Sequence, residues 1–271
     1  MGSSLAWLSG DFRLLEDAAY PELTFFYGLL TMLSVVLTPI VGIFGPFQNG
    51  QTGSSNRELF LPAGYAFSIW GVNYLGLLAL GVWLMLNAQR QNPRAIRAAP
   101  WIVVTAVFNV VWIFFAGQTS TVPWTVPTLI VMEVSAWIAY FALQIGNHEL
   151  PILERRLHLP FQIYIGWLSV ATVANSAAAL NVLGWNAWGL SPSFWTILML
   201  LVATLVAYLV GTLTGQDNVY RAVFVWAFIG IVVEQFSIPV IAWTAGAMAL
   251  AVLVMIVFSN RSKSSRILSG T

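Results

Sequence analysis

Long apolar segments dominate this sequence and restrict the structures that it can adopt. A helix that crosses a membrane needs about 20 mostly apolar residues. Eight segments of this kind occur, over residues 22–44, 63–87, 99–117, 123–146, 159–182, 191–213, 218–235 and 238–258. The sequence therefore predicts an all-α polytopic membrane helix bundle with about eight transmembrane helices.

The composition fits a lipid environment and argues against several classes of protein. Hydrophobic residues make up 59% of the chain and charged residues 8%, whereas a soluble chain carries about 25% charged residues. The net charge of +1 provides no basic surface for nucleic acid. The chain has no cysteine and only two histidines, so we expect no metal site. No Ser/His/Asp arrangement or phosphate loop is present, so no catalytic residue is predicted and an enzyme is the weakest interpretation.

The division between the last two segments depends on a short polar interruption. The apolar stretch runs from Tyr220 to Phe258 and is broken only around Glu234–Pro239. A single helix over this stretch would be about 58 Å long, nearly twice the hydrocarbon thickness of a bilayer. We therefore expect a turn near Glu234–Pro239.

The basic residues support eight spans and an orientation. With eight spans, ten of the eleven Lys and Arg residues fall on one side of the membrane, and Arg57 alone falls on the other. Because basic residues concentrate in cytoplasmic loops, this asymmetry predicts that both termini are cytoplasmic. The membrane itself, a bacterial inner membrane or an organelle or thylakoid membrane, is not specified.

Two segments outside the spans carry expectations of their own. Residues 1–20 form a short N-terminal segment without the pattern of a cleavable signal peptide. The long outer loop, residues 45–62, is rich in Gly, Asn, Ser and Pro, which is typical of irregular structure. Its length allows a lid over the outer end of the bundle, with a passive connection as the alternative.

Four polar side chains lie deep in the predicted spans: Asn73, Asn109, Asn175 and Glu133. Each asparagine is expected to form a hydrogen bond between helices. Glu133 lies near the middle of the fourth span, where desolvation favours the neutral form of a lone carboxyl group. An ionisable group within the membrane suggests function, and a protonated, purely structural hydrogen bond is the alternative.

Six tryptophans lie too deep in the predicted spans for the aromatic belt at the membrane interface: Trp70, Trp112, Trp137, Trp167, Trp226 and Trp243. A buried indole N–H usually has a partner or faces a cavity. Packing against neighbouring helices is the alternative for each of them.

Three motifs in the first five spans resemble the TspO/MBR family, the tryptophan-rich sensory proteins that include the mitochondrial translocator protein. They are LPAGYAFSIWGVNY at 61–74, NVVWIFF at 109–115 and YIGWLSVATVAN at 164–175. The family carries Ile-Trp-Gly-x-x-Tyr on its second helix, Asn-x-x-Trp on its third and Tyr-x-x-Trp-x-x-x-Ala-Thr-x-x-Asn on its fifth. The order and the helix numbers agree, over roughly residues 20–187.

The resemblance implies a five-helix bundle with a ligand pocket beneath the first loop. Family members bind porphyrins such as protoporphyrin IX, some bind sterols, and many form homodimers. Matched by motif, together with the buried polar positions, the candidate ligand-binding residues are Trp70, Tyr74, Asn109, Trp112, Glu133, Trp167, Ala171 and Asn175. The ligand would be a porphyrin or another tetrapyrrole, with no obligatory cofactor.

The residue chemistry agrees with a pocket for a flat apolar ligand. Trp70 and Tyr74 are four residues apart and share one helix face, as do Trp167 and Ala171. Indole and phenol rings stack on a porphyrin, and the small Ala171 leaves room beside them. Nothing among these residues ligates iron, so a bound tetrapyrrole would be metal-free or held without a protein axial ligand.

The resemblance divides the chain into two parts, a TspO-like core at 1–187 and a three-helix extension with a polar tail at 188–271. For function, the sequence favours a membrane protein that binds tetrapyrroles or similar small apolar ligands, in a regulatory, sensory, receptor or transport role. A secondary transporter that uses Glu133 is an alternative. An accessory subunit of a larger membrane complex that handles pigments is another, with the extra helices as a docking surface.

Overall fold

The computed structural model describes residues 23–44, 59–147, 149–215 and 217–269. Eight long helices run through these residues: α2 (Leu23–Phe44), α3 (Ile69–Met85), α4 (Pro93–Ala116), α5 (Thr125–Ala142), α6 (Ile152–Val182), α7 (Pro192–Leu213), α8 (Asn218–Glu234) and α9 (Pro239–Ser269). Short 3₁₀ helices lie between some of them, including η2 (Gly64–Ser68) before α3 and η4 (Thr119–Trp124) before α5. The predicted all-α fold is confirmed for the described residues.

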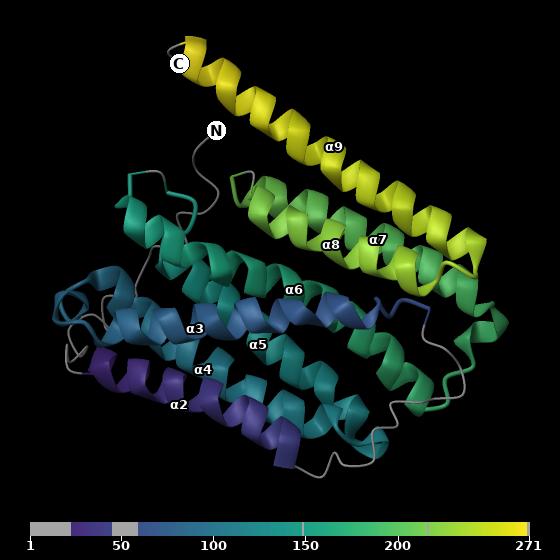
Figure 1. Ribbon diagram of the computed structural model, residues 1–271, viewed down its shortest axis with the longest axis horizontal. Coiled ribbons are helices and arrows are strands. Elements are labelled where there is room, and N and C mark those ends of the chain that lie inside the picture. Colours follow the sequence, from purple (N-terminus) through teal and green to yellow (C-terminus); the bar gives the residue numbers. More distant parts are fainter. Residues whose placement is uncertain (1–22, 45–58, 148, 216, 270–271) are drawn as a thin grey trace.

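The first five of these helices form a closed ring. Helix α2 contacts α3 and α4, α3 contacts α6, and α5 lies between α6 and α4. Helices α7, α8 and α9 form a second layer, and α8 joins it to the ring by contacts with α6 and η2. Figure 1 shows this second layer in green and yellow along one side of the ring, with α9 outermost.

Helix α6 is the central helix of the molecule. Residues 164–171 are all buried, over more than two helical turns, whereas a helix at the surface of a bundle alternates buried and exposed faces. Helices α3 and α5 contact α6 from the ring, and α8 contacts it from the second layer. Residues 164–171 therefore face neighbours on every side, and α6 belongs to both layers.

The number of helices agrees with the predicted spans, and the lengths differ in detail. Seven helical segments are long and apolar enough to cross a membrane. The remaining helix, α8, has 17 residues, which is at the lower limit of about 17 residues for a span. The turn that separates α8 from α9 lies between Glu234 and Pro239, as predicted.

Two helices begin earlier than the apolar pattern predicts. Helix α4 starts at Pro93, where the Asn92 side chain accepts a hydrogen bond from the Arg94 backbone N–H at 3.0 Å. Helix α6 starts at Ile152, and Glu154 in its first turn pairs with Arg94 at 2.9 Å. These charged turns are helical because a cap and an ion pair stabilise them, which a hydropathy pattern cannot show.

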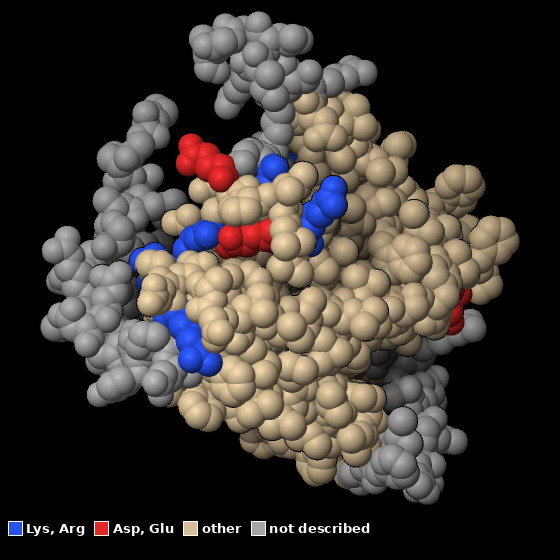
Figure 2. Space-filling model, turned by 60° about the vertical axis from the view of Figure 1, so that its left-hand side comes forward, with Lys and Arg blue, Asp and Glu red and all other residues tan. Residues whose placement is uncertain are grey.

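Charged side chains gather at one end of the molecule. Figure 2 shows basic and acidic side chains together on this end, whereas most of the remaining described surface in this view is uncharged, apart from acidic atoms at the opposite edge. The Arg94–Glu154 pair lies here, between the first turns of α4 and α6. This arrangement is typical of an integral multi-pass membrane protein, whose lipid-facing surface carries no charge.

The two layers approach most closely where glycines face larger side chains. A Cβ atom on Gly166 of α6 would lie 3.0 Å from Val223 Cβ and 3.1 Å from the Tyr220 carbonyl oxygen of α8. On Gly230 of α8 a Cβ atom would lie 2.8 Å from Pro62 Cβ, and the Gly230 carbonyl accepts a hydrogen bond from the Ala63 N–H at 3.0 Å. Small residues at helix crossings are the usual means of close packing in membranes.

We predict that Gly166→Val loosens α8 from α6, because its side chain would overlap Val223 and the α8 backbone. Overpacking of this kind costs about 1–3 kcal/mol, so the midpoint of thermal unfolding in detergent should fall clearly. Gly71→Val is the matched control, because Gly71 is also helical and has no atom within 4 Å of an added Cβ. Equal midpoints for the two variants would contradict the close crossing.

Candidate functional site

An aromatic cluster inside the five-helix ring centres on Trp70 of α3. The Trp70 indole stacks on Trp112 of α4, with ring centroids 5.0 Å apart and 28° between planes. It also stacks on Tyr74, one turn along α3, at 5.6 Å and 24°. The spacing of four residues brings Trp70 and Tyr74 to one helix face, as the sequence predicted.

Helix α6 supplies the perpendicular wall of this cluster. Trp167 meets Trp70 edge to face at 6.3 Å and 88°, and Tyr164 meets it at 6.3 Å and 67°. Phe67 in η2 packs edge to face on Trp167 at 5.7 Å. Offset stacking and edge-to-face contacts are the favoured geometries of aromatic rings, so the cluster is a well-packed unit contributed by α3, α4, α6 and the short helix η2.

Hydrogen bonds between helices fix the polar edge of the cluster. The Asn109 amide of α4 donates to the Tyr164 hydroxyl at 3.0 Å, and the Trp112 indole N–H donates to Asn175 Oδ1 at 3.3 Å. The Asn175 amide in turn donates to the Ala171 carbonyl at 2.8 Å. The predicted role of Asn109 and Asn175 in linking helices is therefore confirmed, whereas the same prediction is wrong for Asn73, whose side chain has no hydrogen-bond partner among the described residues.

Several buried polar atoms near the cluster have no hydrogen-bond partner among the described residues. They are both side-chain polar atoms of Asn73, the Asn109 Oδ1 atom and the Trp167 indole nitrogen. Asn73 is completely buried, and it lies between Trp70 and Tyr74 in the sequence of α3. An unpaired polar group in a membrane interior costs free energy, so these atoms are suited to bind a ligand that brings its own donors and acceptors.

Seven of the eight predicted site residues lie in or directly beside this cluster. Trp70, Tyr74, Trp112 and Trp167 form its rings, Asn109 and Asn175 form its hydrogen bonds, and Ala171 lies one turn beyond Trp167. Sequence reasoning did not select Tyr164, although it is the first residue of the Tyr-x-x-Trp motif. That motif was the signal that could have identified it.

Glu133 lies in a different network, between α5, α6 and α8. Its Oε1 atom accepts hydrogen bonds from the Trp137 indole N–H at 3.2 Å and from the Ser169 hydroxyl. Thr172 lies 3.5 Å from Oε2, and the Tyr220 hydroxyl of α8 donates to Ser169 at 3.0 Å. The sequence identified Glu133 as unusual, but it did not identify these partners or separate Glu133 from the aromatic cluster.

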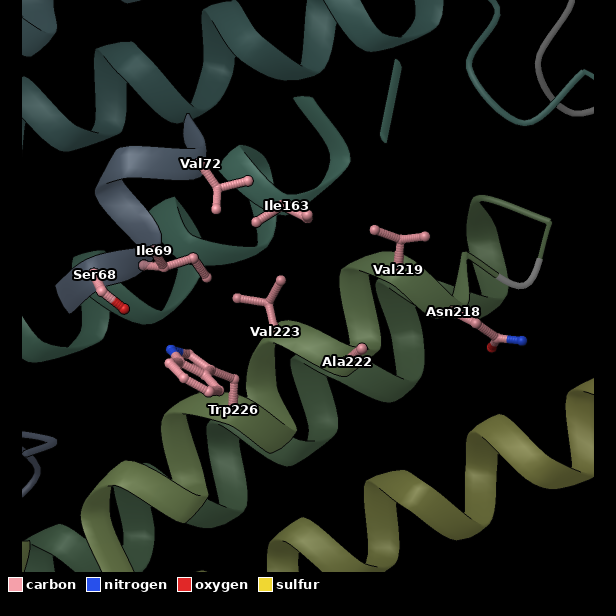
Figure 3. Close-up of a pocket in the computed structure, with 9 residues that line it drawn as sticks. All are labelled: Ser68, Ile69, Val72, Ile163, Asn218, Val219, Ala222, Val223 and Trp226. Carbon is pink, nitrogen blue, oxygen red and sulfur yellow. The ribbon is translucent and has the colours of Figure 1, made fainter. Parts of the chain in front are cut away.

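Two cavities lie outside the aromatic cluster. One is an apolar groove of about 540 Å³, which Figure 3 shows between Val72 of α3, Ile163 of α6 and Val223 of α8, with Trp226 at one end. The Trp226 indole N–H donates to the Ala66 carbonyl at 3.0 Å, so this deep tryptophan has a partner. The other is a polar cavity of about 280 Å³, lined by Tyr140, His158, Gln162 and Asp217 among others. Neither cavity is lined by any of the eight predicted site residues.

The fold and the cluster together define an integral, multi-pass membrane protein with a tryptophan-lined five-helix ring. A family model described as "TSPO-like protein" matches residues 25–258. This chain belongs to that family, as the sequence motifs predicted. The match continues through α7 and α8 into α9, beyond the part in which the motifs occur, so all eight helices take part in it. Neither the curated proteins nor the solved structures compared with this chain give a match.

We predict that Asn109 and Tyr164 are energetically coupled, since their hydrogen bond joins α4 to α6 inside the ring. A double-mutant cycle with Asn109→Leu and Tyr164→Phe should give a coupling free energy of about 0.6 kcal/mol or more, since such bonds in a membrane protein average about 0.6 kcal/mol and reach about 1.7 kcal/mol. The measurement is thermal or denaturant unfolding in detergent. The same cycle with Tyr65→Phe is the control, because Tyr65 is 43% exposed, and its coupling to Asn109 should be close to zero. Similar coupling free energies in both cycles would contradict a specific hydrogen bond between Asn109 and Tyr164.

Proposed function

We propose that this protein is a membrane receptor for flat, apolar aromatic ligands of the tetrapyrrole class, which bind at the aromatic cluster between α3, α4 and α6. The observation that carries the proposal is the Trp70 indole, stacked between Tyr74 and Trp112 and walled by Trp167. Membership of the TSPO-like family supports it.

The cluster offers a ligand the same contacts that its rings make with one another. In the structure the indoles fill the space themselves, so a ligand has to separate Trp70 from Trp112. Each aromatic contact is worth about 0.5–1.5 kcal/mol beyond burial of area, and a porphyrin between the two rings restores contacts of this kind on both of its faces. Because the ligand replaces the ring contacts that it breaks, the free energy needed to separate Trp70 from Trp112 is small compared with the free energy gained by burying the ligand's apolar surface.

The unpaired polar atoms fit the polar parts of such a ligand. Trp167 and Asn73 provide N–H donors, and Asn73 and Asn109 provide carbonyl oxygens, all buried within the membrane interior. The pyrrole nitrogens and the carboxyl groups of a porphyrin are the complementary groups. The described histidine, His158, lies instead at the charged end of the molecule beside Glu154, so we propose a metal-free tetrapyrrole or one held without an axial protein ligand.

We predict that Trp70→Ala and Trp167→Ala each weaken binding of protoporphyrin IX by about 5- to 150-fold, which corresponds to about 1–3 kcal/mol for two lost aromatic contacts. Binding is measured on protein in nanodiscs, by the shift of the Soret band and by quenching of tryptophan fluorescence. Trp243→Ala is the matched control, because Trp243 is 80% exposed on α9. The affinity of this variant for protoporphyrin IX should equal that of the unchanged protein.

A second variant tests the position of the site without removing an aromatic ring. Ala171→Leu adds bulk one turn from Trp167, where Ala171 is only 7% exposed, and should reduce affinity while the tryptophan count stays the same. Unchanged affinity in Trp70→Ala, Trp167→Ala and Ala171→Leu would exclude this cluster as the binding site. Equal losses in Trp243→Ala would show that binding reflects partition into the membrane.

A further inference from the structure

Glu133 lies at the junction of the ring and the second layer. It is near the middle of α5, its hydrogen-bond partners Ser169 and Thr172 are on α6, and the next hydroxyl in the network, that of Tyr220, is on α8. Trp137, one turn further along α5, covers it with a hydrogen bond from the indole N–H. A carboxyl group in this position is held by neutral donors alone.

The described residues provide no counter-charge for a Glu133 carboxylate. The ion pairs that the structure describes involve Glu154, at the charged end of α6. Arg221 on α8 is next to Tyr220 in sequence, but its guanidinium bonds to the Ala207 carbonyl of α7 and to Thr212 and Asn218. An isolated charge inside a bilayer is costly, and a proton removes that cost at this site.

The polar cavity of about 280 Å³ lies at the charged end of the molecule, where α5 ends and α6 and α8 begin. At its wall the Asp217 carboxylate accepts hydrogen bonds from the Tyr140 hydroxyl and the Gln162 amide, each at 2.8 Å. Tyr140 and Gln162 are each seven residues from the Glu133–Ser169 pair along α5 and α6, a rise of about 10 Å. His158 and Arg155 also line this cavity.

A layer of three aromatic rings separates the cavity from Glu133. Trp137 contacts Tyr140 at 5.1 Å and Tyr220 at 5.7 Å between ring centroids. Tyr220 bridges the layer, because its backbone N–H donates to Asp217 at 2.9 Å and its hydroxyl donates to Ser169 at 3.0 Å. The Tyr220 hydroxyl donates to Ser169, and the Ser169 hydroxyl donates to Glu133, so both hydrogen bonds run toward the Glu133 carboxyl group.

We propose that Glu133 carries an exchangeable proton, which enters and leaves through this polar cavity. On release, the O–H bond of the carboxyl group breaks and the proton passes to the Ser169 hydroxyl, which gives its own proton to the Tyr220 hydroxyl. Tyr220 in turn gives its own proton to a water molecule that enters past the ring layer from the cavity, where Asp217 lies. Uptake is the reverse, and the carboxylate is held meanwhile by the donors Trp137 and Ser169.

The titratable groups around this route come from each element packed against it. Tyr220 and Asp217 belong to α8 and its cap, Tyr140 to α5, and His158, Arg155 and Tyr164 to α6, and the Tyr164 phenol interacts electrostatically with Glu133. On the orientation predicted from the basic residues, the cavity opens to the cytoplasm. Glu133 should therefore respond to the pH on the side of Arg94 and Arg155 and not to the pH on the other side. This inference is independent of the aromatic cluster and of its ligand.

Carbodiimide labelling in proteoliposomes tests the route, because dicyclohexylcarbodiimide modifies neutral carboxyl groups in apolar surroundings. The intact protein is oriented, the pH is set separately on each side, and modification of Glu133 is measured by mass spectrometry. Labelling should fall as pH rises on the side of Arg94 and Arg155, and should not change with pH on the other side. Glu133→Gln should lose this label, while other carboxyl groups, such as the exposed Glu234 at the opposite end of α8, identify the side being titrated.

Infrared spectroscopy in D₂O gives a second readout that does not depend on the fold of Glu133→Gln. The carbonyl band of the protonated Glu133 should shift on transfer to D₂O, and Tyr220→Phe should slow that shift at least tenfold, since it removes the hydroxyl next to Ser169. Tyr65→Phe, at an exposed tyrosine outside the network, should leave the rate unchanged. Labelling that follows the pH of the opposite side, labelling that ignores pH, or protection by Na⁺ at constant pH would each overturn the proposal.

Discussion

The close crossing of α6 and α8 at Gly166 is the contact on which the rest of the structure depends. Because Gly166 has no side chain, Val223 and the Tyr220 carbonyl of α8 pack directly on the α6 backbone. This close approach also brings the Tyr220 hydroxyl within 3.0 Å of Ser169. In hydrocarbon, polar groups have no water to bind, so they find partners only where helices approach this closely.

Helix α6 contributes to both the aromatic cluster and the Glu133 network because its two faces are chemically different. Trp167 and Ala171 face the aromatic cluster, whereas Ser169, two residues from each, bonds to Glu133 and Tyr220. A step of two residues turns a helix by about 200°, which places these side chains on opposite faces. The motif at 164–175 thus contains two interleaved patterns, one aromatic and one of hydroxyl groups.

Hydropathy and motif could predict much of this arrangement. The eight helices follow from segment length, and the turn near Pro239 follows because one helix would be far longer than the bilayer is thick. The ring residues Trp70, Trp112 and Trp167 follow from motifs whose spacing puts them on defined helix faces. The charged first turns of α4 and α6 were missed, because hydropathy does not register the Asn92 cap or the Arg94–Glu154 pair. The predicted lid, residues 45–62, lies mostly outside the described residues.

Contacts between distant helices could not be predicted in this way. Nothing in the periodicity of α8 states that Tyr220 faces α6 rather than lipid, because every position in an apolar helix satisfies the bilayer equally well. Only the shape of the opposing surface decides, and here that surface is Gly166 on α6 and the turn at Pro62 and Ala63 against Gly230. Glu133 illustrates the consequence: its type and depth marked it as unusual, whereas its chemistry depends on a helix about 85 residues further along the chain. The family match over residues 25–258 fits this dependence, since the second layer completes an interior that the ring begins.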